Sequence, residues 1–398
     1  MHGEPTLKTA TAIQVLAGTH HWPAQQRVLY GVPYREALSR ELKRSRARRV
    51  FVTTTRSLTG GNLVAGVVAE LGERFAGKFH DIAAHSPREA VIAGAKAIRA
   101  AGADLVVAIG GGSVIDATKV MLIALWRNLE SAQRLSEIAN RIPEASAWDD
   151  DPQRLRMIAI PTTLSAAEFS PHAGITDPVR KVKEGFQHPL SVPKSVILDP
   201  EATRETPLEL MLSTGMRAVD HAVEGWCATR TAPLAEATTL RAMQMLATSL
   251  PAIRRDPADM AARLDAQLGM WLSRFVTMAG IPYGASHGLG YLLGVRGVPH
   301  GITSCLTLHA VLEWNEPVNA DRQRAVVEAF GRPGERASVA MRSFVESLGL
   351  PTRLGQVGIG RDDLPAIAGS WDGTGPLTAN PRPVSGTKDL VAILALAL

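Results

Sequence analysis

Cysteine is scarce in this sequence, which has only Cys227 and Cys305 among 398 residues. Two cysteines cannot make a framework of disulfides, and so few are typical of proteins in a reducing compartment. Long apolar runs are also missing, since stretches such as residues 120–126 are far shorter than the ~18 residues of a membrane-spanning helix. No basic stretch followed by an apolar run marks a secretory signal near residue 1. We therefore expect a cytoplasmic protein without a membrane partner.

An excess of charge of one sign is lacking as well. The formal net charge is only +5, with 20% charged and 45% hydrophobic residues, which excludes general disorder. The one dense basic run, residues 43–49, contains no aromatic side chain that could stack on bases. We interpret this run as a solvated helix end, and we expect no nucleic-acid partner.

The first half of the chain alternates strand and helix patterns. Strands are predicted at residues 27–29, 49–54, 78–82, 104–109 and 157–160, and helices at residues 33–44, 62–75 and about 87–101. The continuous apolar run at 104–109 is typical of a strand buried on both faces of a parallel sheet. Strands separated by single helices predict right-handed crossovers and a doubly wound sheet. The polar stretch 127–156 is interpreted as an insertion or long surface loop.

The pattern changes after Asp199-Pro200. Strand-like runs nearly vanish, and helical patterns cover residues 213–228, 234–249, 260–278 and 333–347. The sequence thus predicts an α/β domain at residues 1–200, an all-α domain at residues 201–398 and a cleft between them.

A glycine-rich loop follows the buried strand and opens a helix that runs to about Trp126. The loop consists of Gly110, Gly111, Gly112 and Ser113. Glycines let a ligand approach the backbone, and the partial positive charge of a helix N-terminus favours a phosphate. The spacing is neither that of the usual dinucleotide fingerprint nor that of a Walker A loop. A tight turn without a ligand would explain the same residues.

The second strand ends in Thr53-Thr54-Thr55-Arg56, without an acidic residue. In dinucleotide-binding folds, an acid near this position holds the ribose hydroxyls and repels a 2′-phosphate. Arg56 would instead attract that phosphate. The sequence leaves both NADH and NADPH open and favours NADPH.

Histidines stand out in the helical half. His221 lies four residues after Arg217 on one helix and shares a face with it, while Asp220 is offset from both. His287 and His300 follow later, each next to a glycine. Imidazole nitrogens suit Zn or Fe(II), so the three histidines are candidate ligands if they converge.

Together these motifs resemble the iron-containing alcohol dehydrogenase superfamily, and most of all its maleylacetate reductase branch. The resemblance covers nearly the whole chain, from residues 26–31 to 380–383. The motifs that carry it are residues 110–113 with Asp116 and Lys119, 161–163 with Glu168, 174–177 with Lys183, 215–216, 221–224, His287 and 299–301.

The resemblance implies a dehydroquinate-synthase-like fold of two domains and a homodimer. NAD(H) or NADP(H) would lie on the glycine loop, and the resemblance places Thr162, Thr163 and Lys183 near its ribose and nicotinamide. A small-molecule substrate would lie in the cleft between the domains.

Two departures from the metal-dependent members concern the metal and the proton. Those members hold the metal with one Asp and three His. The three His correspond here to His221, His287 and His300. The Asp, four residues before the first histidine, is replaced by Arg217, whose guanidinium cannot ligate and would repel a divalent ion. Maleylacetate reductases also lack this Asp as a rule. Tyr291 replaces a fourth histidine that is thought to relay a proton, and its hydroxyl could do the same.

We therefore expect an NAD(P)H-dependent oxidoreductase of the maleylacetate reductase type. It would reduce an acidic keto or enoyl substrate in aromatic-compound catabolism or a related pathway. His221, His287 and His300 would orient or polarise the substrate. Arg217 would either supply positive charge in place of the metal or clamp a substrate carboxylate, and Tyr291 could donate the proton. Alternatively, Arg217 forms a structural ion pair with Asp220 or Glu224.

Three other functions stay open. One is a metal-dependent alcohol dehydrogenase or aldehyde reductase, with Fe or Zn coordination completed by Asp220 or water. Another is a lyase like dehydroquinate synthase, which would need a basic phosphate pocket and a full metal set. The third is a dinucleotide-binding protein without catalysis.

Overall fold

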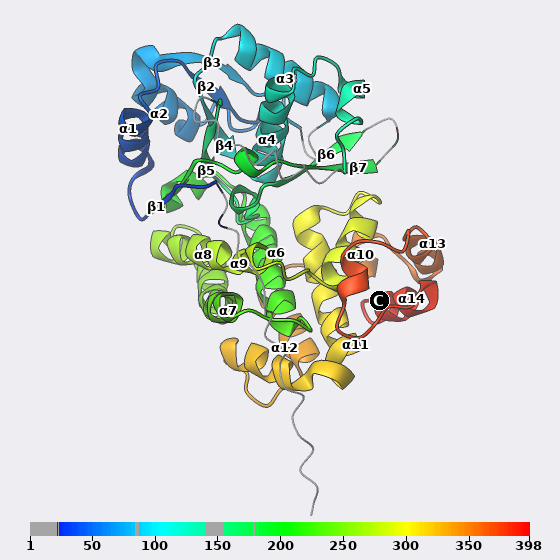
Figure 1. The fold of residues 1–398 in the computed structure, drawn as a ribbon. Coiled ribbons are helices and arrows are strands. Elements are labelled where there is room, and N and C mark those ends of the chain that lie inside the picture. The colour runs from blue at the N-terminus through cyan, green and yellow to red at the C-terminus, as the bar shows by residue number, and fades with distance from the viewer. Residues whose placement is uncertain (1–21, 23, 84–86, 141–153, 178–179, 181) are drawn as a thin grey trace, which may run out of the picture.

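The computed structural model describes residues 22, 24–83, 87–140, 154–177, 180 and 182–398 (Figure 1). Strands gather in one part of the molecule, and the helices from residue 208 on form the other. None of the helices in this described part of the chain is long and apolar enough to cross a membrane.

Six parallel strands form the main sheet. They are β1 (Arg27–Tyr30), β2 (Val50–Thr53), β3 (Phe75–Phe79), β4 (Leu105–Gly110), β5 (Met157–Pro161) and β8 (Ser195–Leu198). Their order is β1-β8-β5-β4-β2-β3, and every neighbouring pair is parallel. The predicted α/β fold class is confirmed. Because all six strands point the same way, the ends of β2, β4 and β5 lie along one edge of the sheet.

Helices cover both faces of this sheet. They are α1 (Tyr34–Ser45) and α2 (Asn62–Leu71) on one face, and α3 (Arg88–Ala100) and α4 (Gly112–Trp126) on the other. Successive side chains of a strand point to opposite faces. Val52 and Val107 accordingly pack with α1 and α2, whereas Phe51 and Val106 pack with α3 and α4. This arrangement buries all of β4, as its apolar run predicted.

A hairpin that the sequence pattern did not reveal lies beside the sheet. It pairs β6 (His172–Asp177) with β7 (Val182–Gln187) in antiparallel fashion. Ala173 and Ile175 pack against α4 in a buried cluster. The fully buried Lys119 of α4 donates hydrogen bonds to the carbonyls of Ala167 and His172, each at 2.7 Å. The hairpin is therefore fixed next to the helix that follows the glycine loop.

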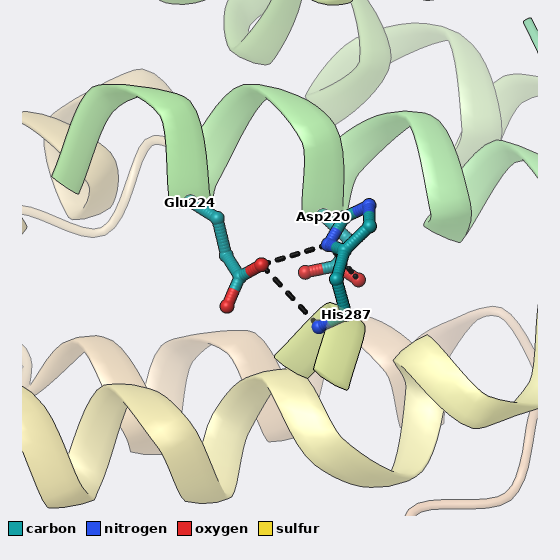
Figure 2. A group of neighbouring side chains, drawn as sticks. All are labelled: Asp220, Glu224 and His287. Atoms are coloured by element: carbon teal, nitrogen blue, oxygen red, sulfur yellow. Dashed lines mark hydrogen bonds and ion pairs between the residues drawn. The ribbon is translucent and has the colours of Figure 1, made fainter. Parts of the chain in front are cut away.

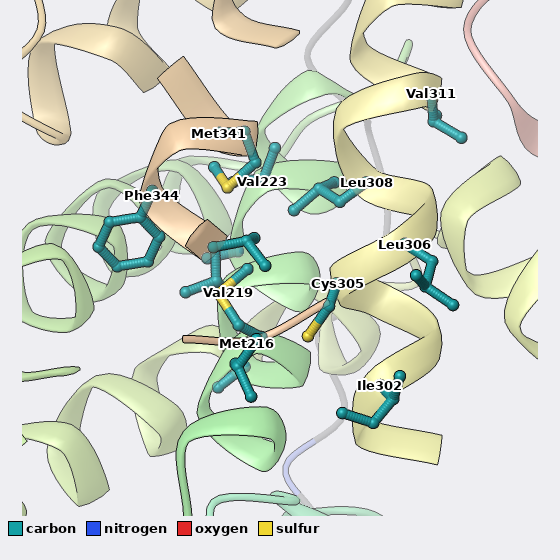
Figure 3. Packing of buried hydrophobic residues seen from close by; sticks show 14 of the residues in the cluster. Met216, Val219, Val223, Ile302, Cys305, Leu306, Leu308, Val311, Met341 and Phe344 are labelled. Carbon is teal, nitrogen blue, oxygen red and sulfur yellow. The ribbon is translucent and has the colours of Figure 1, made fainter. Parts of the chain in front are cut away.

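The second half is helical, as predicted, and the described residues after Leu198 contain no strand. Its helices are α6 (Leu208–Cys227), α7 (Pro233–Arg255), α8 (Met260–Ser273), α9 (Phe275–Met278), α10 (Ala285–Gly294), α11 (His300–Ala329), α12 (Ala337–Ser347), α13 (Leu364–Ala368) and α14 (Thr387–Ala395). Figure 3 shows how Met216 and Val219 of α6 pack near Cys305 of α11 and Phe344 of α12. The same core includes Val196 and Leu198 of β8, so α6 is anchored to the sheet.

Several predicted boundaries were wrong. The helix predicted at 62–75 ends at Leu71, because Gly72 turns the chain at φ +54°, and β3 then begins at Phe75 rather than at residue 78. The helix predicted at 260–278 is interrupted at Arg274. The long helix α11 was not predicted. It contains Pro317 and a kink at Asn319.

The predicted insertion at 127–156 is only partly described, since residues 141–153 lie outside the described residues. The described start of this stretch contributes side chains to the hydrophobic core and is not only a surface loop. Leu129 and Leu135 are buried against α4, and Leu135 ends the short helix α5 (Ala132–Leu135). The domain boundary predicted at residues 200 and 201 falls between β8 and α6 and stays a prediction.

Candidate active site

The glycine loop lies where β4 meets α4. Gly110 has φ +152°, which favours glycine, and a Cβ atom there would come within 2.6 Å of the Val114 side chain. A Cβ atom on Gly111 would lie 2.9 Å from the Thr163 side chain. Thr162 donates its backbone N–H to the carbonyl of Gly110 at 3.1 Å. Glycine is thus required for the close approach between this loop and the end of β5.

This loop fits the phosphates of a dinucleotide. The 15-residue helix α4 begins at Gly112, so Ser113 lies in its first turn, where exposed amides and the helix dipole favour an anion. The hydroxyls of Thr54 and Thr163 are buried without a hydrogen-bond partner among the described residues. Both follow strands that end at the same edge of the sheet as β4. The loop therefore combines a backbone that a ligand can approach closely with nearby threonine hydroxyls that have no hydrogen-bond partner among the described residues.

Asp116 and Lys183, both in the motifs that carry the resemblance, converge on Gly174 of the hairpin. Asp116 Oδ2 accepts the N–H of Gly174 at 3.1 Å, and its Oδ1 lies 3.1 Å from Lys119 Nζ. Lys183 lies so close to Gly174 that a Cβ atom there would overlap its side chain. Asp116 thereby holds the hairpin in place beside the loop.

Thr55 and Arg56, at the end of β2, lie at the surface. The Arg56 side chain is 80% exposed, and its Nε atom lies 2.7 Å from Asp81 Oδ1. Thr55 shares a hydrogen bond with Ser57. The sequence contained no signal for the pairing of Arg56 with Asp81, because Asp81 follows a different strand.

Helix α6 presents buried polar groups to α10 (Figure 2). His287 Nδ1 lies 2.7 Å from Glu224 Oε2 and 3.3 Å from Asp220 Oδ2. Glu224 also accepts the backbone N–H groups of Gly284, Ser286 and His287 at the start of α10. His287 Nε2 is buried without a hydrogen-bond partner among the described residues. One side of the imidazole is therefore fixed by Glu224, whereas the nitrogen on the other side makes no hydrogen bond to the described residues.

Burial determines the protonation states of His221, His287 and Glu224. It lowers the pKa of His221 and of His287 well below 6.5, and the positive charges of Arg274 and Arg217 add to the effect. Burial also raises the pKa of Glu224, helped by the neighbouring Asp220 carboxylate. Both imidazoles are therefore neutral near pH 7, and Glu224 tends to keep its proton.

Arg217 does not extend freely toward a ligand. Its Nη1 atom lies 3.3 Å from Asp220 Oδ2 and donates to Ser304 Oγ at 3.1 Å. Ser304 in turn donates to Asp220 Oδ2 at 2.7 Å. Asp220 is offset from Arg217 by three residues on α6, and the long arginine side chain spans this separation. The ion pair between them matches the alternative interpretation of Arg217.

These residues do not fit a divalent metal. Within the described part of the chain, the one group of three whose ligand atoms lie within 4.8 Å of one another is Asp220, Glu224 and His287. This set shares only His287 with the three histidines expected as ligands. Glu224 is occupied by three amides and by His287 Nδ1, and Asp220 is paired with the permanent cation of Arg217. A metal would have to displace these bonds beside a guanidinium.

Aromatic stacking brings only two of the expected histidines together. The rings of His221 and His287 are 5.0 Å apart, and Tyr283 stacks on His287 at 3.9 Å and on His221 at 5.1 Å. His300, the first residue of α11, instead lies parallel to Tyr291 at 6.4 Å. His300 is nevertheless close enough to lower the pKa of His221 and of His287. Tyr291 itself is 46% exposed.

Three further residues, Arg274, Tyr283 and Glu168, were missed as site residues by the sequence analysis. Arg274 donates to the hydroxyl of Tyr283 at 2.8 Å, and its Nη1 lies 3.4 Å from His221 Nε2. Glu168 is fully buried, both of its oxygens lack a hydrogen-bond partner among the described residues, and burial raises its pKa to about 7. Glu168 belonged to a recognised motif, but Arg274 and Tyr283 had no such signal.

Comparison with known proteins gives a consistent result. The family model for iron-containing alcohol dehydrogenase matches residues 25–200, and that for the C-terminal part of the Fe-containing alcohol dehydrogenase family matches residues 211–398. Maleylacetate reductase of Rhizobium sp. (strain MTP-10005) is 30% identical over 369 residues, which cover 92% of this chain and 93% of that enzyme.

Dehydrogenase ALT3 of Alternaria alternata is 30% identical over 381 residues, covering 86% of this chain and 97% of that protein. Among solved structures, maleylacetate reductase from Agrobacterium tumefaciens has a TM-score of 0.79 at 26% identity. That match covers 96% of this chain and 99% of the other.

Proposed function

Because the chain belongs to the iron-containing alcohol dehydrogenase superfamily, in its maleylacetate reductase-like branch, we propose that it is an NAD(P)H-dependent reductase of an acidic keto or enoyl substrate. That it is a dehydrogenase or reductase follows from the family. The acidic substrate is the proposal, and maleylacetate is the substrate in the names of several relatives. The observation that carries it is the pair of arginines, the buried Arg217 and the partly buried Arg274, beside neutral imidazoles.

The glycine loop and its neighbours would hold the cofactor. Gly110, Gly111, Gly112 and Ser113 would receive the two phosphates, as the absence of side chains and the helix N-terminus favour. Thr162, Thr163 and Lys183 would lie along the ribose and nicotinamide, and Thr55 and Arg56 along the adenosine ribose. Asp116 would act indirectly, by holding the hairpin that carries Lys183. When bound, the nicotinamide supplies the hydride.

His287 would supply the proton. Glu224 keeps its own proton near neutral pH and donates it to Nδ1, so the His287 ring carries its hydrogen on the unpartnered Nε2. This Nε2–H group points away from Glu224 and would donate to the substrate oxygen as charge develops there. The proton from Glu224 would pass to Nδ1 in the same step. His221 and His300 would shape the site, and Tyr291 would serve as a more exposed donor.

Arg217 supplies fixed positive charge where the metal-dependent relatives need an acid. Its guanidinium balances Asp220 and contributes to the low pKa of His287. No step of the proposed reaction therefore passes through a metal. The donor set of this chain is bonded internally, and the Nε2–H group of His287 would stabilise the developing negative oxygen instead.

Oxidation of NADH and of NADPH should be followed with maleylacetate, other keto acids and neutral aldehydes, each with and without a chelator. Turnover of the acids, unchanged by the chelator, is expected. His287→Gln should abolish most of it, while the exposed Arg255→Met on α7 serves as the matched control. Turnover of neutral aldehydes alone, lost with the chelator, would instead establish the metal-dependent alcohol dehydrogenase.

The location and assembly of the enzyme are part of the same proposal. Both cysteines are buried and free, and burial raises the pKa of Cys227 to about 12, so neither thiol is reactive. We infer a cytoplasmic homodimer that acts on a small molecule, to be tested by light scattering and fractionation.

A further inference from the structure

Arg274 is the residue at which the helical run from Met260 to Met278 breaks. It lies between α8 and α9 and belongs to neither. Its guanidinium is held by Tyr283, which accepts a hydrogen bond from Nη1 at 2.8 Å. The buried Nε atom has no hydrogen-bond partner in the described part of the chain. Tyr283 thus holds the Nη1 atom in place, and the Nε–H group is left without an acceptor among the described residues.

The charge of Arg274 acts on groups from both halves of the molecule. It lowers the pKa of His221 on α6, and it also lowers the pKa of His172 on β6 and opposes the rise in the pKa of Glu168. The guanidinium therefore lies where the helical half faces the hairpin that Lys119 and Asp116 fix beside the glycine loop. A carboxylate bound to this guanidinium would therefore lie between the helical half and the hairpin.

Arg274 has no salt-bridge partner among the described residues, although the Glu168 carboxyl is near enough for the two charges to interact. The salt bridges formed by the described residues include Arg217 with Asp220 but none with Arg274. Its nearest contacts, His221 and Tyr283, are neutral near pH 7 because burial disfavours their charged forms. A partly buried guanidinium without a carboxylate is costly unless a ligand provides one.

Arg217 is a poorer partner for such a ligand. Its Nη1 atom is already shared between Asp220 and Ser304, and its charge is balanced by a buried carboxylate. The carboxylate clamp that the sequence analysis assigned to Arg217 is thus better supplied by Arg274.

We propose that Arg274, oriented by the Tyr283 hydroxyl, binds a carboxylate of the substrate and makes the enzyme select acidic carbonyl compounds over neutral ones. This inference rests on the proposed reductase function. Two guanidinium N–H groups suit the two oxygens of a carboxylate, and the adjacent His221 and His287 rings would then face the reacting carbon. Methylation of the carboxylate removes the interaction and leaves the carbonyl unchanged.

The test compares a keto acid with its methyl ester in the wild type, Arg274→Met, Arg274→Lys and the control Arg255→Met. The ratio of kcat/KM for acid over ester should fall about 100-fold in Arg274→Met, mainly through KM for the acid. Arg274→Lys should lie in between, since a lysine keeps the charge but not the fork. Tyr283→Phe should lower the ratio about tenfold, because the guanidinium loses its orienting acceptor. Circular dichroism and an unchanged KM for the cofactor check that each variant folds.

The outcomes separate the two proposals. If the wild type reduces no keto acid, the proposed function fails. If it does, and Arg274→Met keeps the acid-to-ester ratio, only the role of Arg274 fails. Glu168→Gln is the second control, because Arg274 acts on the pKa of Glu168. An equal loss of acid preference in Glu168→Gln would mean that Arg274 acts through Glu168 and would overturn direct binding.

Discussion

Nδ1 of His287 lies 2.7 Å from Oε2 of Glu224, while Nε2 on the opposite side of the ring is buried and has no hydrogen-bond partner among the described residues. The group that faces Nδ1 decides which nitrogen carries the hydrogen of a neutral imidazole. The state of Glu224 therefore controls whether His287 can donate a proton to a ligand.

Replacing His287 should affect the chemical step. In His287→Gln we expect kcat to fall by about 10² to 10⁴, the range found for the loss of a general acid. The KM for NADPH should change little, because the glycine loop and not His287 would hold the phosphates. Steady-state kinetics with a keto acid measure both constants, and a kcat within threefold of the wild type would assign the proton to another group such as Tyr291.

The pH profile should report on Glu224. Burial and Asp220 raise its pKa, so Glu224 loses its proton only on the alkaline side of neutrality. Once ionised, it draws the hydrogen of His287 to Nδ1, and kcat should decline as the pH rises. Glu224→Gln cannot titrate, so its kcat should be about tenfold lower at neutral pH but should lack this decline. An alkaline decline that persists in Glu224→Gln would contradict the relay.

Glycine at position 111 should be needed for cofactor binding. A Cβ atom there would lie 2.9 Å from Thr163, which forces the loop and the end of β5 apart. We expect Gly111→Ala to raise the dissociation constant for NADPH about tenfold or more, measured by fluorescence titration. Gly355→Ala is the matched control, because a Cβ atom there meets nothing within 4 Å. Equal affinities in the two variants would argue against the loop as the phosphate site.

The choice between the two cofactors should depend on Arg56. Its guanidinium is exposed and pairs with Asp81, so a 2′-phosphate would compete with that carboxylate. Arg56→Ala should raise the KM for NADPH several-fold and leave that for NADH unchanged. Asp81→Asn should lower the KM for NADPH, because the competing charge is removed. A wild-type KM for NADH far below that for NADPH would refute the preference.

Glu168 should make stability depend on pH. Burial raises its pKa in the folded protein to about 7, above the usual 4.5, so between these values the folded state holds more protons than the unfolded state. The free energy of unfolding should therefore fall as the pH rises from 4.5 to about 7. In Glu168→Gln that part of the slope is lost, and the difference from the wild type at alkaline pH is at most roughly 3 kcal/mol. Urea unfolding of both proteins at several pH values measures this difference. If the free energy of unfolding changed with pH in the same way in both proteins, the role of Glu168 would be contradicted.

Local patterns in the sequence predicted much of the fold. The apolar run of β4, the glycines after it and the helical periodicity around His221 each depend on neighbouring residues, and the structure has the corresponding elements. The hairpin β6–β7 escaped because residues such as Lys183, Glu184 and Gly185 weaken the strand pattern. Its stability comes from contacts with α4, which lie far away in the sequence.

The site was harder to predict, because long-range packing determines its pairings. Asp220 and Glu224 are one turn apart on α6, a spacing that could have suggested a buried acidic pair facing one partner. Nothing local connects Arg274 with His221, 53 residues earlier, since they meet only because α6 packs against α8. The stacking of Tyr283 on His287 likewise depends on the turn that precedes α10.

The carboxylate of Glu224 accepts the amides of Gly284, Ser286 and His287, so it also completes the first turn of α10. One side chain thereby serves folding and proton transfer at once. A replacement of Glu224 would therefore also remove backbone hydrogen bonds that position His287. The acidity of the proton source and the local structure of α10 cannot be changed separately at this position.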